Sequence, residues 1–197
     1  TFRYHSGFYD GVEKQFRGYE QVERELLSDM SRDAQEPGLR VDDYDVGKTT
    51  PALASNKLRS RVYAGTAPNL ALLTDTTQLY EACAVADVGM PTPAITFPCL
   101  RATTTTAVER DVANAVTTRV EFDYDGYGNG TISRDLGVIH FGTTQQPRPC
   151  DACTQSGAFG KPCGMMCTGD ERFVENEYIT PGTATAGKWF VGRPRRA

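Results

Sequence analysis

The sequence has little of what enzymes and nucleic-acid-binding proteins need. Its 197 residues include 2 histidines and 1 tryptophan, and the net charge is −4. A charge this close to neutral, and acidic, provides no electrostatic footprint for a nucleic acid. The longest apolar runs, such as residues 70–73, are far shorter than the roughly 20 residues that cross a bilayer. We therefore expect no nucleic-acid partner and no membrane-spanning segment.

There is also no initiator methionine and no signal peptide. Residues 1–4, Thr-Phe-Arg-Tyr, already have the composition of a strand. We expect the chain to be a fragment of a longer protein, with any export signal elsewhere. Its 39% hydrophobic and 23% charged residues are ordinary for a globular protein.

Catalytic groups are not assembled in any recognisable pattern. His5 and His140 have no serine or aspartate nearby in a nucleophile setting, so packing or surface roles explain them better. Asp123 and Asp125 are expected to be solvated charges on one wet strand face. The sequence predicts that the chain is not an enzyme and has no catalytic or organic-cofactor-binding residues.

Short strands joined by turns are the predicted architecture. Threonine, valine, tyrosine and phenylalanine are frequent, and glycine and proline recur throughout. The clearest strand covers residues 116–125, where Val120, Phe122 and Tyr124 point to a face to be buried and Arg119 and Glu121 point to water. Glycine and asparagine in residues 126–130 favour a tight reversal, and residues 131–136 return as the partner strand.

Other segments are assigned by the same criteria. Further strands are expected at 58–63, at 95–108 with an interruption at Pro98, at 172–179 and at 188–191. Loops are expected at 32–38, 89–93 and 142–149.

One segment conflicts with an all-β prediction. Within residues 18–30, Tyr19, Val22, Leu26 and Met30 recur at helical spacing, in a stretch rich in glutamate and arginine. This pattern predicts a short amphipathic helix.

Cysteines are concentrated in one part of the chain. Cys150, Cys153, Cys163 and Cys167 form two close pairs in a stretch rich in glycine and proline. Two such pairs fit one structural zinc ion with four thiolate ligands, and they fit disulfides equally well. The stretch has too few apolar residues to order itself, so we expect a metal or covalent cross-link here.

The two remaining cysteines, Cys83 and Cys99, are 16 positions apart in the sequence. They are close enough to pair across a loop. Two small buried apolar side chains explain them as well, so the sequence leaves both interpretations open.

Four motifs follow one another along most of the chain. The first is residues 5–19, His-Ser-Gly-Phe-Tyr-Asp-Gly-Val-Glu-Lys-Gln-Phe-Arg-Gly-Tyr, and the third, residues 122–129, is close to a YD-repeat unit. The second joins residues 44–53 to 58–63, and the fourth joins 169–178 to 189–194. This series resembles Rhs/YD-repeat shell proteins, especially the B components of insecticidal Tc toxin complexes and related plasmid virulence proteins.

The resemblance implies a mainly β fold of antiparallel strands and hairpins, forming part of a spirally wound shell. It implies structural roles for the motif residues, with Arg17 pairing with a carboxylate to fix the first turn. The motif residues are Tyr9, Asp10, Glu13, Phe16, Arg17, Gly18, Tyr124, Asp125, Gly128 and Asn129. The implied organisation is a shell segment at 1–137, a cysteine-rich inserted loop at 138–168 and a continuation of the shell at 169–197.

In function, the resemblance implies a non-catalytic segment of a toxin-encapsulating shell that is secreted or extracellular. The implied partners are the rest of the parent shell, an enclosed toxic C-terminal region and other toxin-complex subunits. The alternative from another class is a carbohydrate- or receptor-binding β module of a secreted protein. An exposed aromatic platform, with Tyr124, Tyr127 and Trp189 as candidates, would favour that alternative.

Overall fold

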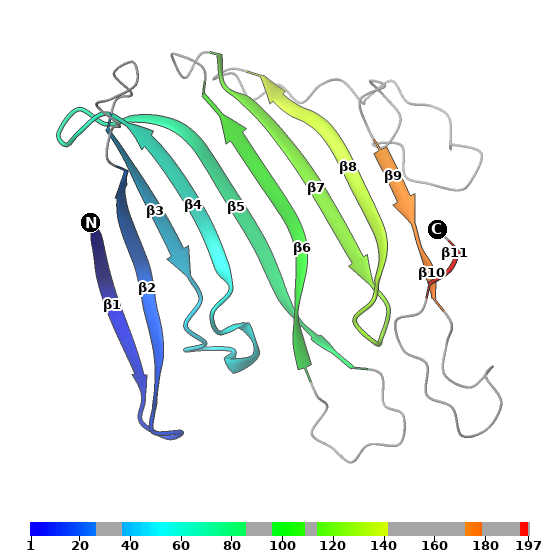
Figure 1. Ribbon diagram of the computed structural model, residues 1–197. Coiled ribbons are helices and arrows are strands. Elements are labelled where there is room, and N and C mark those ends of the chain that lie inside the picture. Colours follow the sequence, from blue (N-terminus) through cyan, green and yellow to red (C-terminus); the bar gives the residue numbers. More distant parts are fainter. Residues whose placement is uncertain (27–36, 86–95, 109–113, 142–171, 179–193, 197) are drawn as a thin grey trace.

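The chain folds into one open, twisted layer of β-strands. The computed structural model describes residues 1–26, 37–85, 96–108, 114–141, 172–178 and 194–196. Nine strands lie side by side in sequence order, each antiparallel to the next (Figure 1). They are β1 (Phe2–Asp10), β2 (Gln15–Leu26), β3 (Gly38–Tyr44), β4 (Lys57–Ala64), β5 (Ala71–Ala84), β6 (Thr96–Ala107), β7 (Val116–Tyr124), β8 (Gly130–Phe141) and β9 (Arg172–Glu175).

Three short elements complete the description. The 3-10 helix η1 (Pro51–Leu53) lies in the connection between β3 and β4. β10 (Glu177–Tyr178) and β11 (Pro194–Arg196) form a separate two-stranded ribbon. In the part of the chain that the structure describes, no helix is long and apolar enough to cross a membrane. The predicted class, mainly antiparallel β, is confirmed.

The predicted helix at residues 18–30 is wrong over the residues that the structure describes. Residues 15–26 form β2, which pairs with β1 on one side and β3 on the other; the remainder lies outside the described residues. The helical spacing of Tyr19, Val22 and Leu26 is real, but helix propensity is a weak preference. Two neighbouring strands supply backbone partners along the whole segment, and this outweighs the local preference.

The strand predictions are mostly confirmed. The strand expected at 58–63 is β4, and residues 172–179 contain β9 and β10, separated at Asn176. The expected interruption at Pro98 is wrong, because β6 runs through it from Thr96 to Ala107. In the described residues β7 pairs with β6 only from Ala102 onward, so Pro98 has a neighbouring strand on one side only. Sheets tolerate proline at such positions.

β3 and β5 were not predicted as strands. The strand expected at 188–191, the loops at 89–93 and 142–149 and most of the loop at 32–38 lie outside the described residues. β8 continues to Phe141, past the proposed boundary at 137. Because residues 142–171 and 179–193 lie outside the described residues, the division of the chain into a shell segment, an inserted loop and a continuation stays a prediction.

The predicted hairpin at 116–136 is confirmed as β7 and β8, with Arg119 and Glu121 on one face as expected. Its apolar face is less buried than expected: Val120, Phe122 and Tyr124 are all half-buried. Buried hydrophobic residues are few in the described chain and small or medium in size, namely Val41, Val46, Cys99, Ala102 and Ala115. A single layer has only its own curvature and side chains to cover its apolar groups, so it forms little core.

Candidate structural site: the Tyr-Asp turns and the charged face

The turn between β1 and β2 is organised by Asp10. Its Oδ1 accepts hydrogen bonds from the backbone N–H groups of Val12 (2.9 Å) and Glu13 (3.1 Å). Its Oδ2 accepts from Arg17 Nε at 3.0 Å. The Glu13 amide, followed by the Val12 amide and the Arg17 guanidinium, holds the pKa of Asp10 below its ordinary value. The carboxylate therefore closes the turn in its ionised form.

Arg17 lies between this turn and the connection after β3. Its side chain is 8% exposed and also contacts Glu13, with 2.7 Å between a guanidinium nitrogen and Oε2. A guanidinium nitrogen lies 3.4 Å from the position that a Cβ on Gly47 would occupy, in the connection after β3. The implied pairing of Arg17 with a carboxylate is thus present in the structure. The arginine joins two turns that are distant in sequence.

The turn between β7 and β8 is organised by Asp125. Its Oδ1 accepts from the N–H groups of Tyr127 and Asn129, both at 2.9 Å, and its Oδ2 accepts from the Asn129 side-chain amide at 2.9 Å. The Gly128 N–H donates to the Asp125 carbonyl, and Gly128 has a φ of 84°, which favours glycine. Asp125 was predicted to be a solvated strand charge. It is instead the acceptor that folds the turn.

Asp45 repeats the arrangement after β3. Its Oδ1 accepts from the Gly47 N–H at 2.6 Å. The aspartate of each Tyr-Asp pair is the last residue of an odd-numbered strand or directly follows it, and the odd strands all run in the same direction. The three aspartate turns therefore lie at the same end of the sheet, toward the bottom of Figure 1. The recurrence of Tyr-Asp in the sequence marks a structural repeat.

One face of the sheet carries ion pairs from β1 to β8, and we call it the charged face. Cross-strand neighbours share a face, and the pairing register places these residues together. Its pairs include Arg61–Asp43 at 2.7 Å, Arg59–Asp75, Arg101–Glu81 at 2.8 Å and Arg119–Glu121 at 2.8 Å. The bidentate contact with Asp75 raises the pKa of Arg59.

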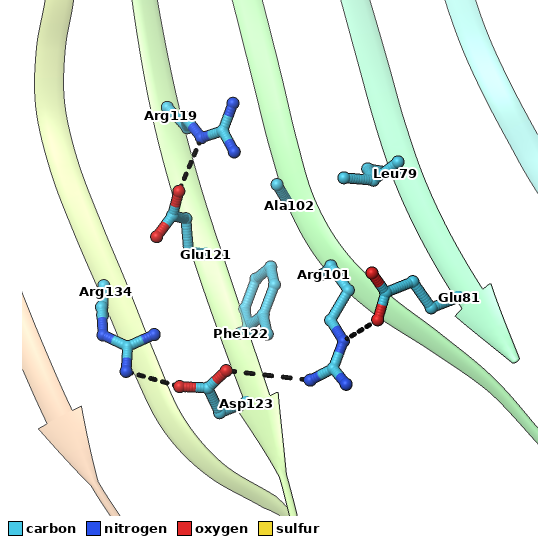
Figure 2. Close-up of a pocket in the computed structure, with 9 residues that line it drawn as sticks. All are labelled: Leu79, Glu81, Arg101, Ala102, Arg119, Glu121, Phe122, Asp123 and Arg134. Atoms are coloured by element: carbon cyan, nitrogen blue, oxygen red, sulfur yellow. Dashed lines mark hydrogen bonds and ion pairs between the residues drawn. The ribbon is translucent and has the colours of Figure 1, made fainter. Parts of the chain in front are cut away.

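A shallow hollow of about 410 Å³ lies on the charged face over β5 to β8 (Figure 2). Asp123 bridges two arginines in it, at 3.7 Å from Arg101 and 2.5 Å from Arg134. Each charge is thus paired with an opposite charge, on the next strand or, for Arg119 and Glu121, on the same strand. The buried Nε atom of Arg134 has no hydrogen-bond partner among the described residues. The hollow is polar and open to solvent, and it holds no arrangement of a nucleophile with a base.

The charged side chains of the hollow are mutually paired, so the geometry favours a structural role for them. Asp123, predicted as a solvated charge, is one of these paired residues. His5 lies 3.4 Å from Glu23 on the same face, and the side chain of His140 lies outside the described residues. Among the described residues, no group of three or more histidine, cysteine, aspartate or glutamate side chains is placed to hold a metal.

Exposed aromatic rings gather at the β1 edge of the sheet. Phe2 and Tyr4 are stacked with centroids 6.3 Å apart, and Tyr4 lies 4.9 Å from Tyr19. Phe16 meets Tyr19 edge-on at 5.1 Å. All four residues are exposed. The candidate platform of Tyr124, Tyr127 and Trp189 is a different one: Tyr124 and Tyr127 are half-buried, and Trp189 lies outside the described residues.

The cysteines divide into two groups. Cys83 and Cys99, whose state the sequence left open, are joined by a disulfide, with their Cα atoms 5.8 Å apart. Cys150, Cys153, Cys163 and Cys167 lie outside the described residues. The predicted cross-link among these four cysteines therefore stays a prediction. The 83–99 pairing could not be chosen from the sequence, because it depends on how β5 and β6 align.

Together, these features define a class of fold: an open antiparallel β-shell segment with aspartate-closed turns. No family model and no curated protein matches the sequence. Solved structures do match. A crystal structure of TcdB2-TccC3 matches with a TM-score of 0.58 and 16% identity, over 75% of this chain and 10% of that chain.

Two related crystal structures give the same result. TcdB2-TccC3 without its hypervariable C-terminal region has a TM-score of 0.56 at 15% identity, over 76% of this chain and 10% of that one. TcdB2-TccC3-Cdc42 has a TM-score of 0.55 at 17% identity, over 75% and 9%. The chain thus has the fold of an Rhs- or Tc-toxin-like shell, as the motifs implied. It spans about a tenth of the length of these neighbours.

Proposed function

We propose that this chain is a non-catalytic wall segment of a toxin-encapsulating β-shell. The observation that carries the proposal is the open single-layer sheet, whose charged face is neutralised by its own ion pairs. A layer that is accessible to water on both faces forms little core by itself, but it suits a wall that continues in both directions. The likeness to TcdB2-TccC3 supports the same function.

The proposed partners follow from the same comparison. One neighbour is described as TcdB2-TccC3 without a hypervariable C-terminal region. By analogy, we propose that the parent of this chain encloses its own toxic C-terminal region, is secreted, and assembles with other toxin-complex subunits. The wall segment needs no substrate, and its polar side chains are used in turns and ion pairs.

The test is protease protection of the C-terminal region in the intact parent protein. Gly65 has a φ of 88°, and a Cβ there would lie 2.5 Å from the carbonyl oxygen of Asn69. Gly65→Ala should therefore distort the wall. Gly11 has open space around it, so Gly11→Ala is the matched control. We expect proteinase K to spare the C-terminal region in the wild type and in Gly11→Ala, and to degrade it in Gly65→Ala. If proteinase K degraded the C-terminal region of the native wild-type protein as fast as that of Gly65→Ala, encapsulation would be refuted.

The absence of catalysis needs a separate test. A broad screen for hydrolase and transferase activity should find no turnover by the chain. Turnover that a single substitution in the hollow abolishes, such as Glu121→Gln, would overturn this part of the proposal.

A second candidate function is carbohydrate binding at the exposed rings of Tyr4 and Tyr19. Neighbouring, exposed aromatic rings with hydroxyl groups suit the apolar faces and polar edges of sugars. A glycan panel tests this candidate. Binding that Tyr4→Ala abolishes would favour it, and no binding by the wild type would remove it.

The cysteine-rich stretch at residues 150–167 carries a further proposal, from sequence alone. We propose that its four cysteines form one cross-link, either a zinc site or disulfides. A zinc site would release about one metal ion per chain to a chelator and leave thiols that can be alkylated. Disulfides would release no metal and would expose thiols only after reduction. Four free thiols without metal in the native protein would contradict both forms.

A further inference from the structure

The Cys83–Cys99 disulfide lies where, in the described residues, β5 and β6 pair only with each other. Cys83 is opposite Phe97 in the register, and Cys99 is opposite Glu81, so the disulfide joins diagonal neighbours on β5 and β6. Within the described residues, β6 pairs with β7 only from Ala102 onward. The end of the β5–β6 hairpin therefore extends beyond the next strand. Its residue Pro98 has no N–H to donate.

Phe97 connects this projecting end to the Tyr-Asp turn of the following hairpin. Its ring meets that of Tyr124 edge-on, with centroids 6.4 Å apart. A Cβ placed on Gly128 would lie 3.1 Å from two atoms of the Phe97 ring. The ring thus lies directly against the turn that Asp125 closes. The position of the ring depends on the strand end that the disulfide holds.

We propose that the Cys83–Cys99 disulfide is a redox-sensitive clamp on the Asp125 turn, acting through Phe97. While the disulfide is intact, the end of β6 keeps the Phe97 ring against Gly128 and Tyr124. When it is reduced, this end keeps its pairing with β5 and its contacts with η1 and β7 but loses its covalent link. The ring then moves away from the turn more often, and the turn opens more often.

The chemistry is thiol–disulfide exchange with a dithiol reductant. Cys99 is 0% exposed, whereas Cys83 is partly exposed, so the entering thiolate attacks the sulfur of Cys83. Cys99 leaves as a thiolate and takes up a proton. The second thiol of the reductant then attacks the mixed disulfide and releases Cys83. Two electrons and two protons pass to the protein, and the reductant becomes a disulfide.

The chain contains a matched internal control. The Asp10 turn uses the same kind of aspartate acceptor, but its extra contact comes from Arg17 and involves no cysteine. Reduction of Cys83–Cys99 should leave the Asp10 turn unchanged. Comparison of the two turns separates a local effect from general loosening of the sheet.

The test is amide hydrogen exchange in the intact protein with and without dithiothreitol. Reduction should accelerate exchange at Tyr127, Gly128 and Asn129 by roughly tenfold or more and leave Val12 and Glu13 unchanged. Cys83→Ser/Cys99→Ser should show the faster exchange without reductant and no further change with it. The double variant keeps the other four cysteines, so a lack of further response to reductant shows that they do not cause the effect. Phe97→Ala should also show the faster exchange and little response to reductant.

Three results would overturn the proposal. The first is free thiols at Cys83 and Cys99 in the unreduced protein. The second is unchanged exchange at residues 127–129 after alkylation has shown that the disulfide is reduced. The third is equal acceleration in both turns, which would mean that reduction loosens the whole sheet.

Discussion

The first hairpin of the sheet, β1–β2, and the fourth, β7–β8, both enter their turns with the dipeptide Tyr-Asp, yet they hold those turns differently. Asp10 receives one extra hydrogen bond from Arg17, in the following strand, whereas Asp125 receives two from Asn129, inside the turn. The first hairpin lies at the edge of the sheet, with exposed aromatic rings. The fourth lies between neighbouring strands and is half-buried. One motif thus serves both an edge hairpin and an internal one.

The largest expected effect is at the internal turn. Asp125→Ala removes the acceptor of three hydrogen bonds and leaves their half-buried donors unpaired. The free energy of unfolding should fall by about 2–3 kcal/mol, measured by chemical unfolding. Asp125→Asn keeps one oxygen acceptor and should lose less. An unchanged unfolding midpoint for Asp125→Ala would show that the turn does not depend on its aspartate.

The second prediction compares one glycine in each turn. Gly128→Ala forces a side chain into a φ of 84° and against the Phe97 ring, so it should cost about 1–2 kcal/mol from the backbone alone. Gly11→Ala meets open space and should change the stability by less than about 0.5 kcal/mol. Thermal unfolding of the two variants side by side provides the measurement. Equal losses would mean that the difference between the turns is wrongly assigned.

The third prediction concerns pH at the edge turn. The folded pKa of Asp10 is lowered from 3.8 by the Glu13 amide, the Val12 amide and Arg17, so its contribution to stability is fully present above that value. It is lost as the pH falls below 3.8 and through the lower folded pKa. NMR titration of the Val12 and Glu13 amides should show a midpoint below 3.8, and Arg17→Gln should move that midpoint upward. A wild-type midpoint at or above 3.8 would contradict the assignment.

The smallest effect is expected on the charged face of the internal hairpin. Arg119 pairs with Glu121 in a partly solvated position, so Arg119→Ala should cost less than about 1 kcal/mol in chemical unfolding. Phe122→Ala, at a position that the alternation assigns to the opposite face, removes a half-buried ring and should cost more. Equal effects would show that the two faces of β7 have been confused.

Much of the fold could be predicted because it depends on short-range patterns. The alternation through residues 116–124 and the glycine-rich turn after it predicted the β7–β8 hairpin. β5 was missed although it is long, because its residues, from Ala71 to Ala84, mix threonine, leucine and alanine without clear alternation. Its pairing with β4 up to Thr77 and with β6 from Thr74 to Ala84 defines it as a strand.

The candidate site divides in the same way. The motif at residues 5–19 indicated a role for Asp10, Glu13 and Arg17, and the structure brings these three side chains into contact. The charged face was missed beyond β7. Arg101, for example, is separated by 20 positions from Glu81 and by 22 from Asp123. Only the register of neighbouring strands shows that these charges meet.

By itself, the sequence determined the features that a few neighbouring residues decide: the aspartate and glycine turns, the alternation of β7 and the absence of long apolar segments. The tertiary structure decided that residues 15–26 are a strand, that Cys83 pairs with Cys99, and which carboxylate each arginine meets. The reason is physical. A turn is closed by groups within one stretch of chain, whereas a strand's partners come from residues that only folding brings near.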